Sequence, residues 1–380
     1  MKRSNVLWAF ILMSLLTIGV STTFSVSTAT SRIGAGEIKH VIIIVEENEA
    51  YSSIVNSSEA PYENQLIRQY ALAGNYFSPE SPSLPNYIDL TAGSDLGITT
   101  DCSPSPSCQV NGGMTNIGDL LHSSNLSWKE YAESMPSPCY RSNSGNYAVR
   151  HNPFVYYTDV TDNSTYCNQH VVPMNITTGA GFIDDLQSGK LPNFSFITPN
   201  LCNDGHNSCS NTMTQVQQID KWLGVVVPKI IDSPEFASTA LFITYDQGST
   251  LAYSSQVACI LVSPFANSGY VSHNYYTHFS LLATVENIVG LGSLGRNDTT
   301  AAAMTDLFAT PSANQSTTSP SNSTFTQPTV TSTSQTKTIW TGENIVIAVA
   351  VSIFSVIAVL TVLVKRHNAD NRSSTSGSQT

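Results

Sequence analysis

The sequence predicts an α/β domain whose central strands are covered by helices, and three observations lead to this prediction. Several short runs are rich in β-branched or aromatic residues and apolar on both faces, which is typical of strands buried between helices. Two longer segments repeat their apolar residues at the spacing of an amphipathic helix. Polar residues directly follow two of the runs, which is where open α/β sheets bind their ligands.

The predicted strands and helices all lie in the body of the chain. The strands are His40–Val45, Asn193–Thr198, Ala240–Tyr245 and Val257–Val262. Helical periodicity is clearest in Thr214–Asp232 and Phe279–Val289. A shorter segment, Ile88–Gly93, has the pattern of a helix that is ended by glycine.

Polar pairs follow two of these strands. Glu47 and Asn48 come after the first strand, and Asp246 and Gln247 come after the third. Because ligands bind outside the carboxyl ends of such strands, we expect the two pairs to converge. Burying the charge of Asp246 is costly unless a cation compensates it, so this edge of the sheet is a candidate metal site.

The composition argues against two classes of protein. The chain has 380 residues, with 16 Lys and Arg against 27 Asp and Glu, and a formal net charge of -11. Nucleic acid is therefore not an expected partner, because phosphate backbones are held by clustered positive charge. Hydrophobic residues make up 41% of the chain, which argues against disorder for most of it. Ser, Thr, Asn and Gln stand where charged residues are usually found, as is typical of extracellular glycoproteins.

Both ends of the chain predict export. Residues 1–30 begin with basic residues, continue into an apolar run and end in small residues, which is the layout of a signal peptide. An uncleaved anchor is the alternative, although the apolar run is shorter than the ~20 residues that span a bilayer. Residues 345–364 form an unbroken apolar run followed at once by basic residues, which predicts a transmembrane helix and a cytoplasmic tail at 365–380.

The segment before this span is predicted to be an extended, glycosylated stalk. Residues 309–343 are rich in Ser, Thr, Pro, Asn and Gln and hold almost no large apolar side chains. Residues 36–308 remain for one large domain. The sequence thus predicts a domain outside the cell, tethered to the membrane by its C-terminal span.

Asparagine and cysteine usage fits an exported chain. Eight Asn-x-Ser/Thr sequons lie on the exported side, at Asn56, Asn125, Asn163, Asn175, Asn193, Asn297, Asn314 and Asn322. Six cysteines form candidate local disulfides in an oxidising compartment, although spacing does not fix their connectivity. The candidate pairs are Cys102 with Cys108, Cys139 with Cys167 and Cys202 with Cys209. Cys259 lies in an apolar run and is predicted to be a buried free thiol.

Ser83 lies at or just before the start of the short helix that ends at Gly93. Free amide groups and the helix dipole stabilise a phosphate or sulfate at such a position. The alternative is an ordinary N-cap serine with Pro85 in the first helical turn. The segment alone leaves both interpretations open.

The turn after the second strand is another candidate site. Asp204 and His206 lie two residues apart in it, and a carboxylate and an imidazole at this spacing suit a divalent metal or an anion. The alternative is a plain turn in which Asp204 bonds its own backbone and Gly205 has a positive φ. His151 and His278 are further candidates, although most lone histidines are structural.

Taken together, these segments give the chain a resemblance to the phosphoesterase family that contains secreted acid phosphatases and bacterial phospholipases C. The stretches that carry it are IKHVIIIVEEN, SPSLPNYIDLTAGS, SWKEYAESMP, YAVRHNPF, LPNFSFITPNLCNDGHN, LFITYDQG and HFSLLATVENIVGLGSLGRND. They occur in family order over about residues 38–298, and they are most similar to the shorter acid-phosphatase branch. The resemblance implies the fold of the alkaline phosphatase superfamily, with a central, mostly parallel sheet, and a divalent metal ion as cofactor.

The resemblance also implies a role for each candidate residue. The implied metal ligands are Glu47, Asn48, Ser83 and Asp246. The implied catalytic residues are the nucleophile Ser83 and the histidines His151, His206 and His278, which meet the metal, the phosphate or the leaving group. The implied substrate contacts are Asn86 and Asp204.

One position departs from the family pattern. The family usually has a second acid after the strand aspartate, and this chain has Gln247. An amide oxygen still ligates a hard cation but adds no negative charge, so we expect the metal affinity to differ.

The implied activity is hydrolysis of a small phosphomonoester through a phosphoserine intermediate, by an extracellular acid phosphatase. If a histidine donates the proton to the leaving group, activity should favour low pH, where imidazole is charged. The alternatives are a phospholipase C-type phosphodiesterase, favoured by the membrane tether, and a non-catalytic surface glycoprotein of the same fold.

Overall fold

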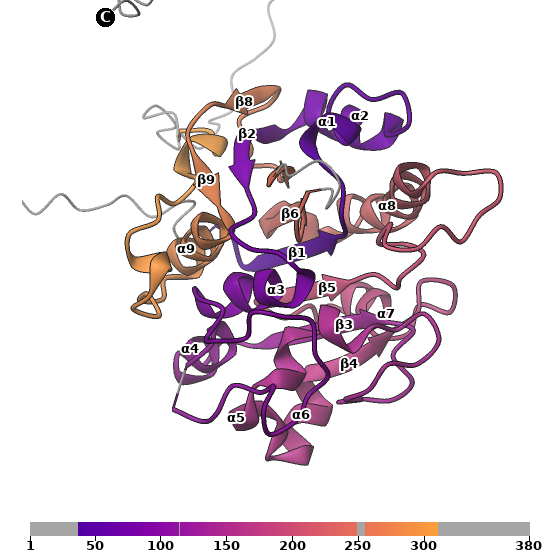
Figure 1. The fold of residues 1–380 in the computed structure, drawn as a ribbon. Coiled ribbons are helices and arrows are strands. Elements are labelled where there is room, and N and C mark those ends of the chain that lie inside the picture. Colours follow the sequence, from indigo (N-terminus) through magenta and orange to yellow (C-terminus); the bar gives the residue numbers. More distant parts are fainter. Residues whose placement is uncertain (1–36, 114, 249–254, 311–380) are drawn as a thin grey trace, which may run out of the picture. The chain divides into compact units, whose positions relative to one another are not determined.

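A mixed, mostly parallel sheet of nine strands runs through the described part of the chain, which in this computed structural model is residues 37–113, 115–248 and 255–310 (Figure 1). The strand order is β4-β3-β5-β1-β6-β7-β2-β8, and β9 also pairs with β2. The strands are β1 His40–Glu46, β2 Ala71–Phe77, β3 Trp128–Glu133, β4 Val171–Met174, β5 Phe194–Thr198, β6 Thr239–Tyr245, β7 Gln256–Val262, β8 Tyr270–Ser272 and β9 Tyr276–Thr277.

Strand β1 lies at the centre of the sheet, and its two neighbours determine which loops meet at its carboxyl end. Strand β1 pairs in parallel with β5 on one side and with β6 on the other. Residues 41–45 of β1 are completely buried, as expected for a strand covered on both faces. Among the described strands, β7 runs antiparallel to its neighbours β6 and β2, while the remaining pairs are parallel.

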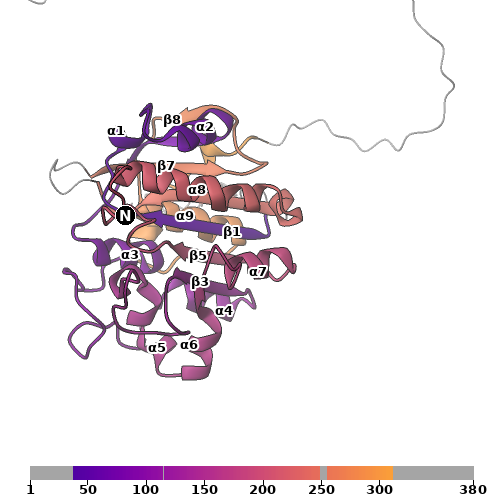
Figure 2. The same ribbon diagram turned by 90° about the vertical axis from the view of Figure 1, so that its right-hand side faces the viewer.

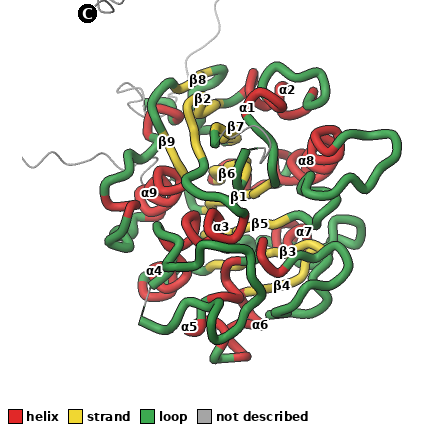
Figure 3. The backbone as a smooth tube through the Cα atoms, viewed as in Figure 1, coloured by secondary structure: helices red, strands yellow, loops and turns green. Residues whose placement is uncertain are grey.

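Helices lie on both sides of this sheet. Helices α7 and α8 are on one side and α4 and α9 on the other, as the two perpendicular views show (Figures 1 and 2). The α-helices are α1 Tyr51–Ile54, α2 Pro61–Gln69, α3 Ser83–Ala92, α4 Ile117–Ser123, α5 Thr158–Thr161, α6 Ser164–His170, α7 Phe182–Gln187, α8 Gln215–Ile231 and α9 His278–Val289. The short 3-10 helices are η1 Val149–His151, η2 Pro153–Tyr156, η3 Pro234–Ser238, η4 Asn297–Thr299 and η5 Thr305–Leu307. Much of the chain around α3 is loop (Figure 3).

The predicted α/β fold class and its main elements are confirmed. The four predicted strands correspond to β1, β5, β6 and β7, and the two long helices to α8 and α9. Helix α3 begins at Ser83, as the prediction that Ser83 lies at or just before the helix start allows, and it ends at Ala92 with Gly93 as its C-cap at a φ of 73°. A Cβ atom on Gly93 would also lie 2.6 Å from Asp298 Oδ1, so the helix end requires glycine for two reasons.

The cysteine predictions are also confirmed. Disulfides join Cys102 to Cys108, Cys139 to Cys167 and Cys202 to Cys209, and Cys259 is a buried free thiol. The predicted signal peptide, most of the stalk, the transmembrane span and the tail lie outside the described residues. Within those residues, no helix combines the length and the hydropathy that crossing a membrane requires.

Candidate active site

The carboxyl ends of the neighbouring parallel strands β5, β1 and β6 bring three acids together. Glu47 follows β1, Asp204 lies in the turn after β5, and Asp246 follows β6, and all three are completely buried. The Glu47 N–H donates to the Asp204 carbonyl oxygen at 2.8 Å, and the Asn48 N–H donates to Asp246 Oδ1 at 3.0 Å. The structure therefore brings together the two polar pairs that follow the first and third predicted strands.

Ser83 faces these acids from the first turn of α3. Its Oγ donates to Glu47 Oε2 at 3.0 Å, and the same hydroxyl is near enough to Asp246 to lower the pKa of that carboxyl group. Tyr87, one turn further along α3, donates its hydroxyl to Glu47 Oε1 at 2.8 Å. Pro82 is the N-cap of the helix, and the Ser83 side chain makes no capping bond. Ser83 is thus not an ordinary N-cap serine, since its hydroxyl is held between two carboxylates.

The oxygen atoms around Ser83 fit a divalent cation. Asp246 Oδ2 is buried and has no hydrogen-bond partner among the described residues. Asn48, whose φ is 60°, places its side chain against Glu47, with Nδ2 donating to Glu47 Oε2 at 2.9 Å. Gln247 Nε2 donates to Asn48 Oδ1 at 2.8 Å. Because hard cations prefer carboxylate, amide and hydroxyl oxygens, Glu47, Asn48, Ser83 and Asp246 would hold such an ion.

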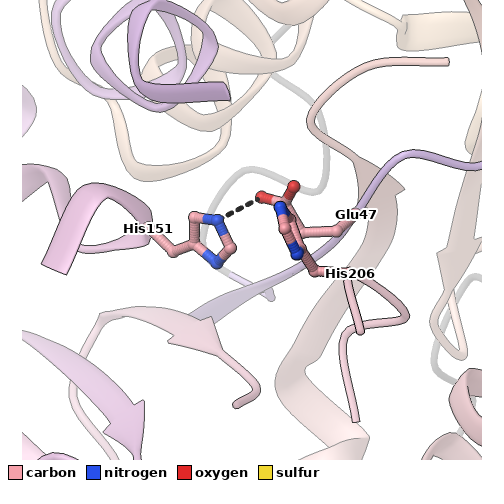
Figure 4. A group of neighbouring side chains, drawn as sticks. All are labelled: Glu47, His151 and His206. Carbon is pink, nitrogen blue, oxygen red and sulfur yellow. Dashed lines mark ion pairs between the residues drawn. The ribbon is translucent and has the colours of Figure 1, made fainter. Parts of the chain in front are cut away.

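His151 lies between two of the acids. Its Nε2 is 3.1 Å from Glu47 Oε1, an ion pair drawn in Figure 4, and its Nδ1 is 3.1 Å from Asp204 Oδ2. The imidazole is 2% exposed and stacks on the Tyr87 ring, with centroids 5.3 Å apart and planes 8° apart. Glu47, His151 and His206 also offer ligand atoms that all lie within 4.8 Å of one another. The two histidines are therefore further candidate metal ligands.

His206 is held by groups at the more exposed side of the site. Arg150 Nη2 donates to His206 Nε2 at 2.8 Å, so the ring proton is on Nδ1, which donates to Asn207 Oδ1 at 2.9 Å. Arg150 Nε also lies 3.5 Å from Asp101 Oδ2. Asp101 Oδ1 in turn accepts from the Leu84 N–H at 3.0 Å. A chain of contacts thus connects His206 to the backbone amide next to Ser83.

The turn after β5 has the features of a plain turn and also those of a functional site, the two alternatives that its sequence left open. Asp204 Oδ1 accepts from the His206 N–H at 2.7 Å, and Gly205 has a φ of 86°, as in a plain turn. The other oxygen, Oδ2, meets His151 at 3.1 Å. Glu133 on β3 also holds the turn, because its Oε2 accepts a hydrogen bond from the Asn200 N–H at 3.0 Å. One carboxylate therefore shapes the turn and orients an imidazole.

Two predicted site residues make their contacts away from the Ser83 hydroxyl. Asn86 is fully buried and binds the backbone that precedes Ser83, since its amide pairs with both Glu80 N–H and Glu80 O. His278 Nε2 donates to the Asp246 carbonyl oxygen at 2.7 Å, and its Nδ1 accepts from the Tyr76 hydroxyl at 2.9 Å. Both ring nitrogens of His278 are thereby engaged.

Burial controls the charge of the site. It raises the pKa of Glu47 well above its usual range, and the neighbouring Asp246 and Asp204 add to the shift. Burial likewise raises the pKa of Asp204 and of Asp246 to about 7. It lowers the pKa of His151 well below its usual range, and the positive charge of Arg150 adds to this. Such strongly perturbed groups in one place are typical of catalytic or metal sites.

Three residues of this site were not identified from the sequence as functional. Tyr87 orients Glu47, Arg150 holds His206, and Asp101 joins Arg150 to α3. Tyr87 carried a usable signal, because it stands four residues after Ser83 and so on the same face of the helix. Asp101 lies in an irregular segment and Arg150 in the three-residue 3-10 helix η1, and neither has a periodicity that indicates which way a side chain points.

Comparison with known proteins places this geometry in context. A phosphate-repressible acid phosphatase of Penicillium chrysogenum is 32% identical over 245 residues, which cover 62% of this chain and 56% of that protein. A phosphatidylinositol-3-phosphatase of Mycobacterium tuberculosis is 28% identical over 275 residues, which cover 71% of this chain and 82% of that protein. This chain thus spans little more than half the length of the Penicillium relative.

Solved structures show the same fold at much lower identity. The crystal structure of a protein in the alkaline phosphatase superfamily from Vibrio parahaemolyticus superposes with a TM-score of 0.50 at 14% identity, covering 72% of each chain. The fold is therefore alkaline-phosphatase-like. Residues 53–292, well over half of the chain, match the Phosphoesterase family. They include α3 with Ser83, the Asp204 turn and Asp246, and this chain belongs to the Phosphoesterase family.

Proposed function

We propose that this chain is a metal-dependent phosphoester hydrolase that cleaves phosphomonoesters through a phosphoserine intermediate. The observation that carries the proposal is the buried Ser83 hydroxyl, which lies between Glu47 and Asp246 at the start of a helix. The names of the similar acid phosphatases and of the mycobacterial phosphatase support a phosphomonoester as the substrate.

The residues of the chain divide the reaction between them. Ser83 Oγ attacks phosphorus, the bond from phosphorus to the leaving oxygen breaks, and water later hydrolyses the phosphoserine. A divalent cation held by Glu47, Asn48, Ser83 and Asp246 would lower the pKa of the attacking hydroxyl and offset the charge of the phosphoryl oxygens. The first amide groups of α3 stabilise the same oxygens.

The histidines have different parts in this proposal. The rings of His151 and His206 lie 5.7 Å apart, and we assign the proton of the leaving oxygen to His151, whose Nε2 has no hydrogen-bond partner among the described residues. Both ring nitrogens of His206 are engaged by Arg150 and Asn207, so we assign His206 to positioning. His278 has no free ring nitrogen and burial lowers its pKa to about 4, so we assign it to positioning the Asp246 backbone. Asn86 is assigned to holding the loop that precedes Ser83.

Replacement of the nucleophile tests the proposal. We expect Ser83→Ala to reduce the kcat for p-nitrophenyl phosphate by on the order of 10³-fold or more, because the variant lacks the hydroxyl that forms the phosphoserine. The matched control is Ser188→Ala, which removes an exposed hydroxyl bonded to the Asp185 carbonyl oxygen. Circular dichroism and thermal unfolding check that both variants fold. Near-normal turnover by Ser83→Ala would contradict the assignment.

Metal removal is the second test. Dialysis against a chelator should abolish hydrolysis, and adding back single divalent cations should restore it, because the acids and the Ser83 hydroxyl need the cation to act together. Metal analysis of the purified protein identifies the ion. Full activity in the metal-free protein would contradict a metal-dependent mechanism. A protein without phosphatase activity under any of these conditions would support a non-catalytic surface glycoprotein instead.

We also propose that the domain works outside the cell, tethered by the C-terminal span predicted at residues 345–364. Three disulfides support an oxidising compartment. Five of the six sequon asparagines in the described residues are exposed, at Asn56, Asn125, Asn163, Asn175 and Asn297. Protease treatment of intact cells should release the phosphatase activity into the medium. Activity that becomes accessible only after cell lysis would contradict this placement.

A further inference from the structure

The Asp101 carboxylate occupies the donors that lie next to the candidate nucleophile. Its Oδ1 accepts from the Leu84 N–H at 3.0 Å, and Leu84 directly follows Ser83. Its Oδ2 lies 3.5 Å from Arg150 Nε. One carboxylate therefore faces both a helix-start amide and a guanidinium, a pair of donors that suits the oxygens of a phosphate.

These donors belong to the same site as the catalytic groups. Arg150 uses a second nitrogen, Nη2, to hold His206 Nε2 at 2.8 Å. His151, the next residue in the chain, is 2% exposed, and its Nε2 has no hydrogen-bond partner among the described residues. That nitrogen lies 3.1 Å from Glu47, the residue whose other carboxylate oxygen accepts from Ser83. Arg150, His151 and the Leu84 amide thus belong to one network around the Ser83 hydroxyl.

The Asp101 side chain is free to leave while its backbone is fixed. The side chain is 36% exposed, so rotation places the carboxylate in water. The next residue, Cys102, is joined to Cys108 by a disulfide, and its carbonyl oxygen accepts a hydrogen bond from the Tyr156 hydroxyl. The carboxylate is therefore in contact with solvent, whereas the backbone of the loop that carries it is anchored.

We propose that Asp101 is an intramolecular occupant of the phosphate position, and that Arg150 with the Leu84 amide binds the substrate phosphate after displacing it. This inference rests on the proposed phosphoesterase function and adds two residues to its site. Because the Asp101 carboxylate must be displaced first, substrate and product phosphate both bind more weakly than they would to a vacant position. Arg150 is a substrate-binding residue, and Asp101 is its competitor.

Binding of inorganic phosphate, followed by titration calorimetry on the metal-loaded protein, tests the proposal. Asp101→Asn and Asp101→Ala should each tighten phosphate binding by about fivefold, as expected when a partly exposed ion pair no longer competes. Arg150→Gln should weaken it by about tenfold or more, because a charge-assisted contact is lost. The control is Asp162→Asn, which removes one exposed negative charge outside this network and should leave binding unchanged.

Further measurements distinguish direct competition between the Asp101 carboxylate and phosphate from a general repulsion of phosphate by the Asp101 charge. The KM for p-nitrophenyl phosphate should fall in the Asp101 variants, in parallel with the dissociation constant of phosphate. In the Arg150→Gln background the gain from Asp101→Asn should be smaller, because only the Leu84 amide is left to be freed. An equal gain in both backgrounds would show that Asp101 acts only through its charge and would overturn the proposal.

Two other outcomes would also overturn it. If both Asp101 variants bind phosphate more weakly, Asp101 is a positioning residue for Arg150 and not a competitor. If Arg150→Gln binds phosphate as tightly as the unaltered chain, the guanidinium does not contact phosphate. Titration calorimetry measures phosphate binding and needs no turnover. It therefore tests the roles of Asp101 and Arg150 even if the activity of Ser83→Ala contradicts the proposed mechanism.

Discussion

At the scale of single residues, Gln247 is the most informative position in the site. Its Nε2 donates to Asn48 Oδ1 at 2.8 Å, which is the side-chain oxygen that would ligate a cation. An acid at this position would supply a negative charge and no such donor. Gln247 therefore lowers the negative charge of a site that already holds three buried acids, Glu47, Asp204 and Asp246.

Placing an acid at position 247 should increase the metal affinity and lower the stability of the metal-free protein. We expect Gln247→Glu to tighten Mn²⁺ or Mg²⁺ binding by about tenfold, because an additional carboxylate faces the cation. Without metal the same variant should unfold at a lower temperature, since a further acid is buried beside Asp246. Calorimetric titration and thermal unfolding with and without chelator measure the two effects. The control is the exposed Gln187→Glu, and equal metal affinity in both variants would exclude position 247 from the metal site.

At the scale of elements, the turn after β5 shows how a short loop of the candidate site is made rigid. The disulfide from Cys202 to Cys209 closes it around Asp204 and His206. A Cβ on Gly205 would collide with the side chain of Ile219 on α8, so the turn packs tightly against that helix. The loop is thus fixed by a covalent bond that closes it and by a close contact at Gly205, which lies between Asp204 and His206.

Two disulfide deletions should separate stability from activity. Replacing Cys202 and Cys209 by Ser should lower kcat/KM by about tenfold or more, because Asp204 and His206 lose their fixed positions. Replacing Cys139 and Cys167 opens a longer loop, 28 residues apart instead of 7, and should cost more stability, about 3 kcal/mol, with little loss of activity. Denaturant unfolding and phosphatase kinetics measure both. Equal activity losses would show that the first disulfide has no local role.

The elements also show what sequence patterns reveal. Apolar runs without charge predicted β1, β5, β6 and β7 closely. Strand β3, Trp128–Glu133, was not predicted, because its buried Glu130 and Glu133 disrupt the apolar pattern and are satisfied only by distant groups such as Thr198 and Trp222. Its partner β4 was also not predicted.

In the candidate site, too, some features follow from local sequence patterns and others depend on distant contacts. Strand order brings the groups after β1 and β6 together, so that convergence could be predicted from the sequence. The atoms that His278 and Asn86 face could not be, because they depend on contacts with Tyr76 and Glu80 that no local pattern encodes. Asp101 and Arg150 were not predicted for the same reason, since their pairing joins a loop to the short 3-10 helix η1.

At the scale of the whole molecule, buried carboxyl groups make the fold suited to acid. Burial raises the pKa of several acids outside the immediate site, and four of them illustrate the effect because none of the four forms an ion pair in the described residues. They are Glu63, Asp89 and Glu286, each raised to about 8, and Glu130, raised well above its usual range. The folded chain therefore keeps protons that the unfolded chain releases.

The consequence for stability has a definite sign. Between pH 4.5 and about 8 the folded chain retains the Glu63 proton and the unfolded chain does not, so the free energy of unfolding falls as pH rises. Tyr245 donates its hydroxyl to Glu63 Oε1 at 2.8 Å, and the nearby charged groups, Asp220 and Glu49, carry the same sign. In the part of the chain that the structure describes, no cation forms an ion pair that would offset the charge of ionised Glu63.

Glu63→Gln should flatten this pH dependence. We expect the variant to match the unaltered chain near pH 4 and to be more stable at pH 8, with the difference growing by up to about 1.4 kcal/mol per pH unit. Denaturant unfolding across this pH range measures it. The exposed Glu37→Gln is the control and should run parallel to the unaltered chain. Parallel curves for Glu63→Gln as well would show that Glu63 is ionised in the folded state.

The central position of β1 also determines when the site comes into existence. Strand β1 is made early in the chain, yet it pairs with β5 and β6, which are made much later. The hydrogen bond between Asn48 and Asp246 spans 198 residues. Contacts of this range form late, because chain entropy must be overcome before they contribute. A nascent chain that stops before β6 therefore lacks the contact between Asn48 and Asp246, and under the proposed function neither metal binding nor hydrolysis is expected before β6 has docked.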